Sequence, residues 1–134
     1  MTAFMKLNKK NIKKIILILA SSGIGLFTIF FFVSTYYIAK TVKDDCQQIE
    51  EQTHLACVDS FILKLQNEEV SLKDRNHYIW LLGQLGDEKA LPTLKQYYTG
   101  AECDHDKDLC QHELKKAINL IEKQNNIVQK IWGY

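Results

Sequence analysis

The sequence predicts an all-α protein, with one N-terminal transmembrane helix followed by a small antiparallel helical domain of about four helices. Three observations lead to this prediction. The 25 residues from Ile15 to Ala39 contain no charged side chain. From Leu55 onward apolar residues recur at helical spacing, and no segment alternates polar and apolar residues as a strand would. All four cysteines follow the charge-free stretch, as expected if that part of the chain is exported.

The charge-free stretch is long enough to cross a membrane as a helix. At about 1.5 Å per residue it would extend roughly 37 Å, more than the ~30 Å hydrocarbon layer of a bilayer. A cleaved signal peptide has an apolar core of only about 7 to 15 residues and ends at small residues. Here Tyr36 and Tyr37 stand where those small residues would be. We therefore expect an uncleaved signal anchor, with cleavage as the alternative.

The charges on either side of the stretch predict its direction. Five lysines precede it, whereas two lysines and two aspartates follow it closely. Lysine and arginine are retained on the cytoplasmic side of a membrane. Residues 1–14 are thus predicted to be a cytoplasmic basic arm and residues 15–39 the transmembrane helix. The remainder would be extracytoplasmic, or periplasmic in a bacterium with two membranes.

A small-residue pair lies within the predicted span. Ser21 and Gly25 have the small-x-x-x-small spacing that lets two membrane helices approach closely. The pair therefore predicts a helix-pairing face. The alternative is that small residues are simply tolerated in a helix that faces lipid.

Composition narrows the functional classes. A net charge of +1 and a pI of about 7.7 give no basic surface for nucleic acid. A single proline and six glycines leave no low-complexity linker. We divide the exported part into a juxtamembrane extension and turn (40–54), a helical domain (55–123) and a C-terminal aromatic tail (124–134). No nucleophile, base and orienting group stand out together, so no catalytic residue, cofactor or small-molecule substrate is predicted.

The cysteines predict two disulfides. Four cysteines allow three pairings, and we favour the local one, Cys46 with Cys57 and Cys103 with Cys110. On one continuous helix Cys46 and Cys57 would lie about 16 Å apart, so the chain must reverse between them, near residues 52–54. Each bridge is expected to stabilise the domain by about 2 to 3 kcal/mol.

The segment around the second cysteine pair also admits a metal site. Four side chains could bind zinc tetrahedrally, although their spacing is not that of a common zinc motif: Cys103, His105, Cys110 and His112. Three aspartates (Asp104, Asp106 and Asp108) match the opening of a calcium loop, but Leu109 and Lys115 replace the glycine and glutamate that such a loop needs. We therefore expect a disulfide-closed loop here, with metal binding as the alternative.

Four apolar faces predict the helices of the domain. The helix start and stop signals between these faces agree with this prediction, because Ser71 can begin a helix and both Gly86 and Gly100 can end one. The segment 78–82 is apolar nearly all round, so this helix should be the interior layer. The four faces comprise Leu55, Val58, Phe61, Ile62 and Leu65; Leu72, Tyr78, Ile79, Leu82 and Leu85; Ala90, Leu91, Leu94, Tyr97 and Tyr98; and Leu114, Ala117, Ile118 and Ile121.

Residues 78–94, Y-I-W-L-L-G-Q-L-G-D-E-K-A-L-P-T-L, resemble a HEAT-like repeat. Gly83 permits close helix approach, and Gly86 can take the left-handed conformation at a helix end. Asp87 can cap free amides, and Pro92 lies early enough in the second helix to be tolerated. The segments on either side of residues 78–94 match the repeat pattern only weakly. HEAT-like repeats stack helix pairs and present a surface to other proteins, so the resemblance implies a protein-binding module.

We thus expect a single-pass membrane-anchored, extracytoplasmic protein-interaction module, such as an accessory, scaffold or assembly subunit of a membrane complex. Its expected partners are the lipid bilayer and other membrane or extracytoplasmic proteins. Candidate contact residues are aromatic or apolar side chains that the core does not obviously need: Tyr98, Ile131, Trp132 and Tyr134. The alternative function is a metal-binding or sensory domain that uses the Cys/His cluster at 103–112.

Overall fold

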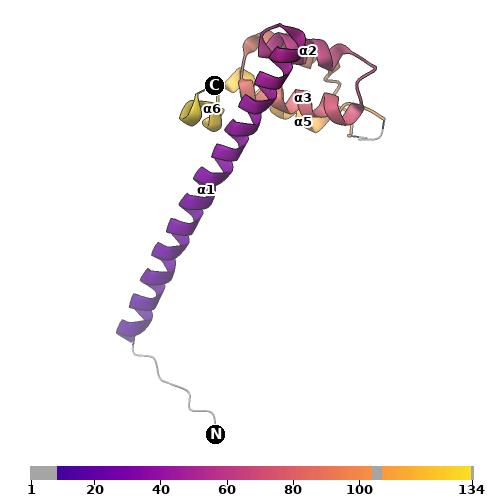
Figure 1. Cartoon of the computed structure of the whole chain (residues 1–134). Coiled ribbons are helices and arrows are strands. Elements are labelled where there is room, and N and C mark those ends of the chain that lie inside the picture. Colours follow the sequence, from indigo (N-terminus) through magenta and orange to yellow (C-terminus); the bar gives the residue numbers. More distant parts are fainter. Residues whose placement is uncertain (1–8, 104–106, 134) are drawn as a thin grey trace. The chain divides into compact units, whose positions relative to one another are not determined.

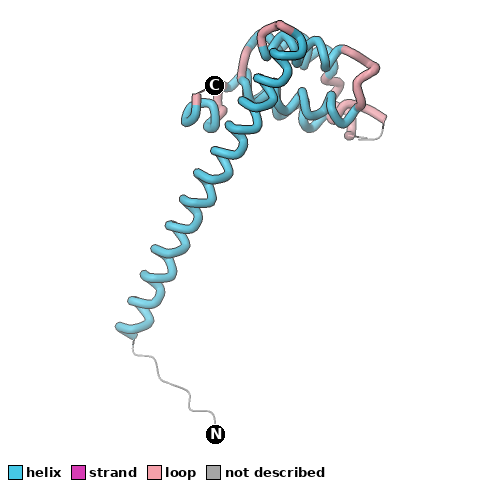
Figure 2. The backbone as a smooth tube through the Cα atoms, in the orientation of Figure 1, coloured by secondary structure: helices cyan, strands magenta, loops and turns pink. Residues whose placement is uncertain are grey.

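The computed structural model describes residues 9–103 and 107–133, and all regular structure within these ranges is helical (Figure 2). The all-α prediction is therefore confirmed for this part of the chain. The elements, most of them labelled in Figure 1, are α1 (Lys9–Thr53), α2 (Cys57–Gln66), α3 (Leu72–Leu85), the 3-10 helix η1 (Glu88–Ala90), α4 (Leu91–Tyr97), α5 (Gln111–Lys123) and α6 (Ile127–Trp132).

The chain divides into two compact units, residues 1–35 and 36–134. In the first unit, α1 exposes apolar side chains over its whole circumference. Six of them have exposed fractions between 63 and 72%: Leu17, Ile24, Leu26, Phe27, Ile29 and Phe30. Among the described residues, one helical stretch, Ser21–Thr53, is long and apolar enough to cross a membrane.

Two threonine hydroxyls in the first unit bond within their own helix. Thr28 donates its hydroxyl proton to the carbonyl oxygen of Ile24 at 2.8 Å, and Thr35 does the same to Phe31 at 3.0 Å. Such bonds satisfy the hydroxyl without water or a partner. They suit a helix surrounded by hydrocarbon, where an unsatisfied polar group is costly.

The second unit is built around α3, which contacts α2 on one side and α5 on the other (Figure 1). Ile79, Leu81 and Leu82 are fully buried, because these helices cover most of the α3 surface. Phe61 of α2 stacks on Tyr78 of α3, with ring centroids 5.5 Å apart. The prediction that this segment forms the interior layer is confirmed.

The second half of α1 contributes to the same core. Val42 and Ile49 are buried in one cluster with residues of α2, α3 and α5. The division of the exported part at residues 40–54 stays a prediction, while α1 itself continues to Thr53. The reason is an apolar stripe at three- and four-residue spacing, which puts its members on one face. The stripe comprises Ala39, Val42, Cys46 and Ile49.

The turn between α1 and α2 is held by a disulfide. α1 ends at Thr53, and His54 takes a left-handed conformation with φ of 58°. This agrees with the reversal predicted near residues 52–54. Cys46 and Cys57 are bonded across the turn, with their Cα atoms 5.0 Å apart. The hydroxyls of Thr53 and Ser60, 2.6 Å apart, add a polar contact.

The hairpin of α3, η1 and α4 confirms four local predictions. A Cβ atom on Gly83 would lie 2.8 Å from Cα of Ala117 in α5, so only glycine permits this approach. Gly86 ends α3 with φ of 68°. Asp87 accepts a hydrogen bond from the Lys89 amide at 2.9 Å, and Pro92 lies in the first turn of α4. The stacking of such hairpins into a HEAT-like array stays a prediction.

The segment expected to be an aromatic tail contains a sixth helix. Asn126 caps α6 by accepting a hydrogen bond from the Gln129 amide at 3.2 Å, and its own amide group donates to the carbonyl oxygen of Gln84. Gln129 donates to the carbonyl oxygen of Leu85 at 2.8 Å. These bonds, together with buried Val128, fix α6 against the C-terminal end of α3.

Candidate functional site

Two adjoining hollows lie beside the chain that connects α4 to α5. Their volumes are about 330 and 300 Å³. They share three lining residues, Ala101, Glu102 and Gln111. We call this pair of hollows the connector groove. Its walls come from α3, α4, α5 and the described residues of the connector.

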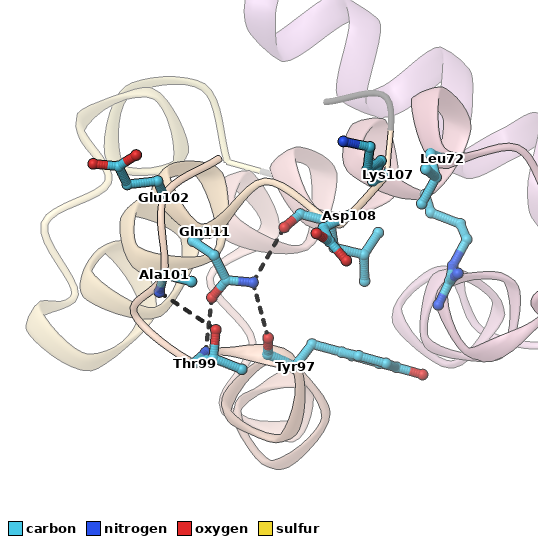
Figure 3. Close-up of a pocket in the computed structure, with 10 residues that line it drawn as sticks. Leu72, Tyr97, Thr99, Ala101, Glu102, Lys107, Asp108 and Gln111 are labelled. Carbon is cyan, nitrogen blue, oxygen red and sulfur yellow. Dashed lines mark hydrogen bonds between the residues drawn. The ribbon is translucent and has the colours of Figure 1, made fainter. Parts of the chain in front are cut away.

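Gln111, the first residue of α5, organises the groove (Figure 3). Only 8% of this residue is exposed. Its side-chain oxygen accepts hydrogen bonds from the Thr99 amide at 2.7 Å and the Gly100 amide at 3.2 Å. Its side-chain nitrogen donates to the carbonyl oxygens of Tyr97 at 3.2 Å and Leu109 at 3.1 Å. All four bonding positions of one amide are thus spent on fixing the backbone on both sides of the connector.

Arg75 and Tyr97 form part of the wall of the larger hollow. The buried Arg75 donates its Nε hydrogen to the carbonyl oxygen of Leu65 at 2.8 Å, in the last turn of α2. Its guanidinium carbon lies 5.7 Å from the centroid of the Tyr97 ring, within cation–π range. Arg75 therefore joins α2, α3 and α4, and it forms no ion pair with a carboxylate of the described residues.

The groove presents a mixed surface. Leu72 and Leu109 supply apolar area, while Glu102, Lys107 and Asp108 supply charges of both signs to the larger hollow. The smaller hollow is lined in addition by Tyr98, Cys103, His112 and Lys115. Such a surface can accept hydrogen bonds, charges and apolar groups of a peptide or a protein loop.

Cys103 and Cys110 lie next to each other at the start of α5 but are not bonded in the structure. The Cys110 amide donates to the side-chain oxygen of Asn76 at 2.8 Å, and the His112 amide donates to the sulfur of Cys103 at 3.1 Å. A hydrogen bond from the Cys110 thiol, followed by that from His112, lowers the pKa of Cys103. Burial is the main cause that raises the pKa of Cys110. The second disulfide stays a prediction.

The structure describes only some of the residues that could bind zinc or calcium. Cys103, Cys110 and His112 are described, whereas His105 lies outside the described residues, as do Asp104 and Asp106 of the calcium alternative. Within residues 9–103 and 107–133, no three potential metal ligands lie close enough to hold one ion. Both metal alternatives therefore stay predictions.

The candidate contact residues fall on different elements. Tyr98 follows α4 and is 37% exposed at the rim of the groove. Ile131 and Trp132 lie on α6, with exposed fractions of 44 and 36%. Tyr134 lies outside the described residues. Sequence reasoning missed Gln111 and Arg75, because their partners are backbone oxygens and amides that only the folded chain brings close.

Another contact joins α6 to α1. The ring of Trp132 meets the ring of Tyr36 edge to face, with centroids 5.5 Å apart. The candidate helix-pairing residues Ser21 and Gly25 are exposed on α1, and a Cβ atom on Gly25 would meet nothing within 4 Å. That two such helices pair through Ser21 and Gly25 stays a prediction.

Comparison of the chain with protein-family models, curated proteins and solved structures found no match. Its function is accordingly argued from its own residues.

Proposed function

We propose that the chain is a single-pass membrane protein whose extracytoplasmic helical domain binds another protein of a membrane complex. In this role it is an accessory, scaffold or assembly subunit. The observation that carries the proposal is the connector groove, a hollowed surface held by Gln111 with the exposed ring of Tyr98 at its rim.

The first part of the proposal is the anchor. An apolar circumference and internally bonded hydroxyls on α1 are properties of a helix in lipid. The lysine excess before Ile15 favours a cytoplasmic N-terminus. The disulfide between Cys46 and Cys57 favours an oxidising compartment for the domain.

The second part of the proposal is the binding surface. Interfaces depend on rigid, well-placed aromatic side chains surrounded by polar groups that can be satisfied. Tyr97 and Tyr98 lie on a stretch of backbone that Gln111 fixes by hydrogen bonds. Little conformational entropy of this segment would therefore be lost on binding. The α3–α4 hairpin, with its close glycine contact and capped turn, supports the proposed HEAT-like character, in which helix pairs display such surfaces.

Site-specific photo-crosslinking in the native membrane tests the binding role. Benzoylphenylalanine at Tyr98 should form an adduct with one defined membrane or exported protein. The matched control position is Glu68, which is exposed in the turn after α2. The Tyr98 adduct should disappear in a Gln111→Leu variant that keeps its helical circular dichroism. Equal adducts at both positions, or none at Tyr98, would contradict a binding groove.

The alternative, a metal-binding or sensory domain, is favoured by one observation. The thiols of Cys103 and Cys110 are close enough to hydrogen-bond, and the backbone of His112 contacts one of them. Intact mass with and without reductant separates the two functions. A loss of about four hydrogens means two disulfides, and such thiols cannot bind zinc. A loss of about two leaves the pair available for metal.

A further inference from the structure

We propose that α6 lies in the outer interfacial layer of the bilayer, where Ile127, Ile131 and Trp132 contact lipid. This inference rests on the anchoring part of the proposed function. It assigns to the bilayer a surface that the sequence alone offered as a protein contact. The occupant is identified by three features of α6: an apolar exposed face, a fixed inner face and an aromatic contact with α1.

The exposed face of α6 is apolar. Ile127, Ile131 and Trp132 have exposed fractions of 55, 44 and 36%. Ile127 and Ile131 are four residues apart, so they lie on one side of the helix. The helix contains one charged residue, the exposed Lys130, and no acidic residue that would repel anionic headgroups. An apolar face with a basic residue beside it is typical of helices that lie in a membrane surface.

The inner face of α6 is fixed to the domain. Asn126 and Gln129 bond to the backbone oxygens of Gln84 and Leu85 at the end of α3, and Val128 is buried beneath them. These three residues prevent α6 from turning its isoleucines inward. The exposed apolar face is therefore a stable feature of the fold rather than a loosely attached tail.

The contact between Trp132 and Tyr36 sets the depth of α6. Tyr36 lies near the outer end of the charge-free stretch, three residues before Ala39, and neighbouring Tyr37 is also exposed. Tyrosine and tryptophan rings gather at the membrane–water interface, where an apolar body and a polar tip both find suitable surroundings. Because the ring centroids of Trp132 and Tyr36 are 5.5 Å apart, their depths in a bilayer would differ by no more than that distance. Tyr36 and Trp132 thus form one aromatic pair at the start of the second unit, where the charge-free stretch approaches its end.

Fluorescence quenching by brominated lipids tests this placement in the full chain. The protein would be reconstituted into phosphatidylcholine–phosphatidylglycerol vesicles, with bromine either near the headgroup end or deep in the acyl chains. Trp80→Phe leaves Trp132 as the only tryptophan. We expect strong quenching by the shallow bromine, weaker quenching by the deep bromine and protection from aqueous iodide. The matched control, Trp132→Phe, leaves Trp80 and should show little quenching by either lipid.

The outcomes separate this inference from the proposed anchor. A protein that fails to float with the vesicles overturns both. A protein that floats while Trp132 is quenched by iodide and not by bromolipid overturns the α6 assignment alone. Protection of Trp132 from both quenchers also overturns it, because a protein surface rather than lipid then covers α6. An Ile131→Asp variant should shift Trp132 emission to longer wavelength and reduce bromolipid quenching, with the circular dichroism unchanged.

Discussion

Cys103 and Cys110 meet at the start of α5 in different surroundings. Hydrogen bonds from the Cys110 thiol and the His112 amide lower the pKa of Cys103, while burial raises the pKa of Cys110. The thiolate is the reactive form of cysteine. As pH rises toward the ordinary thiol range, Cys103 ionises first and Cys110 follows only at higher pH.

We therefore expect iodoacetamide to alkylate Cys103 at lower pH than Cys110 in protein whose second cysteine pair is reduced. Peptide mapping by mass spectrometry across a pH series measures both rates. Single variants, Cys103→Ser and Cys110→Ser, serve as controls that each rate belongs to the assigned thiol. Equal rates at every pH would contradict the asymmetry of the pair.

Gly83 fixes the distance between α3 and α5. A methyl group at this position would come within 2.8 Å of a backbone atom of Ala117, which cannot move aside without shifting α5. We expect Gly83→Ala to lower the free energy of unfolding by about 1 to 3 kcal/mol, despite the better helix propensity of alanine. Denaturant unfolding of the full chain in detergent measures the loss.

Gly23→Ala is the matched control for this substitution. Gly23 also lies within a helix, but a Cβ atom there would meet nothing within 4 Å. The domain should therefore unfold at an unchanged denaturant concentration in this variant. Equal stability of both variants would mean that the close approach of α3 and α5 is not required.

At the scale of elements, the disulfide between Cys46 and Cys57 ties α1 to α2 across a separation of 11 residues. Loop-closure entropy for such a bridge amounts to about 2 to 3 kcal/mol. We expect the Cys46→Ser/Cys57→Ser double variant to lose stability of about that size. Denaturant unfolding with and without reductant checks this, because reductant should destabilise the native chain and leave the double variant unchanged.

The elements also show how far local sequence signals extend. Residues that act on their immediate neighbours, such as Gly86 and Asp87, could be predicted because a helix end and a cap need particular residue types. α6 could not, because Asn126 and Gln129 are held by carbonyl oxygens more than 40 positions earlier in the chain. The core face of α1 is hard to see in the sequence because charged residues lie between its members along the chain, although Val42 and Ile49 keep the helical spacing.

The shape of the connector groove likewise could not be predicted from the sequence. Its residue types were visible in the sequence, and Tyr98 was selected as a contact residue on that basis. Its shape depends on Gln111, whose four hydrogen bonds join backbone groups on both sides of the connector. A polar residue at the start of a predicted helix reveals nothing about such partners, because they become neighbours only after α4 and α5 have packed.

At the scale of the whole molecule, the proposed function requires that the helical domain lie on the outer side of the membrane. The domain core begins with Ala39 and Val42, so the sequence contains no linker between the charge-free stretch and the first core residues. An exported orientation explains the disulfide and gives α6 an outer bilayer surface to contact. A cytoplasmic domain would remove both arguments.

Labelling of intact cells with a membrane-impermeant maleimide tests this orientation most directly. In a Cys103→Ser/Cys110→Ser background, one variant carries Glu68→Cys in the domain and its matched control carries Thr2→Cys in the basic arm. We expect the E68C thiol to react in intact cells and the T2C thiol to react only after permeabilisation. The reverse pattern would place the helical domain in the cytoplasm and contradict the proposed function.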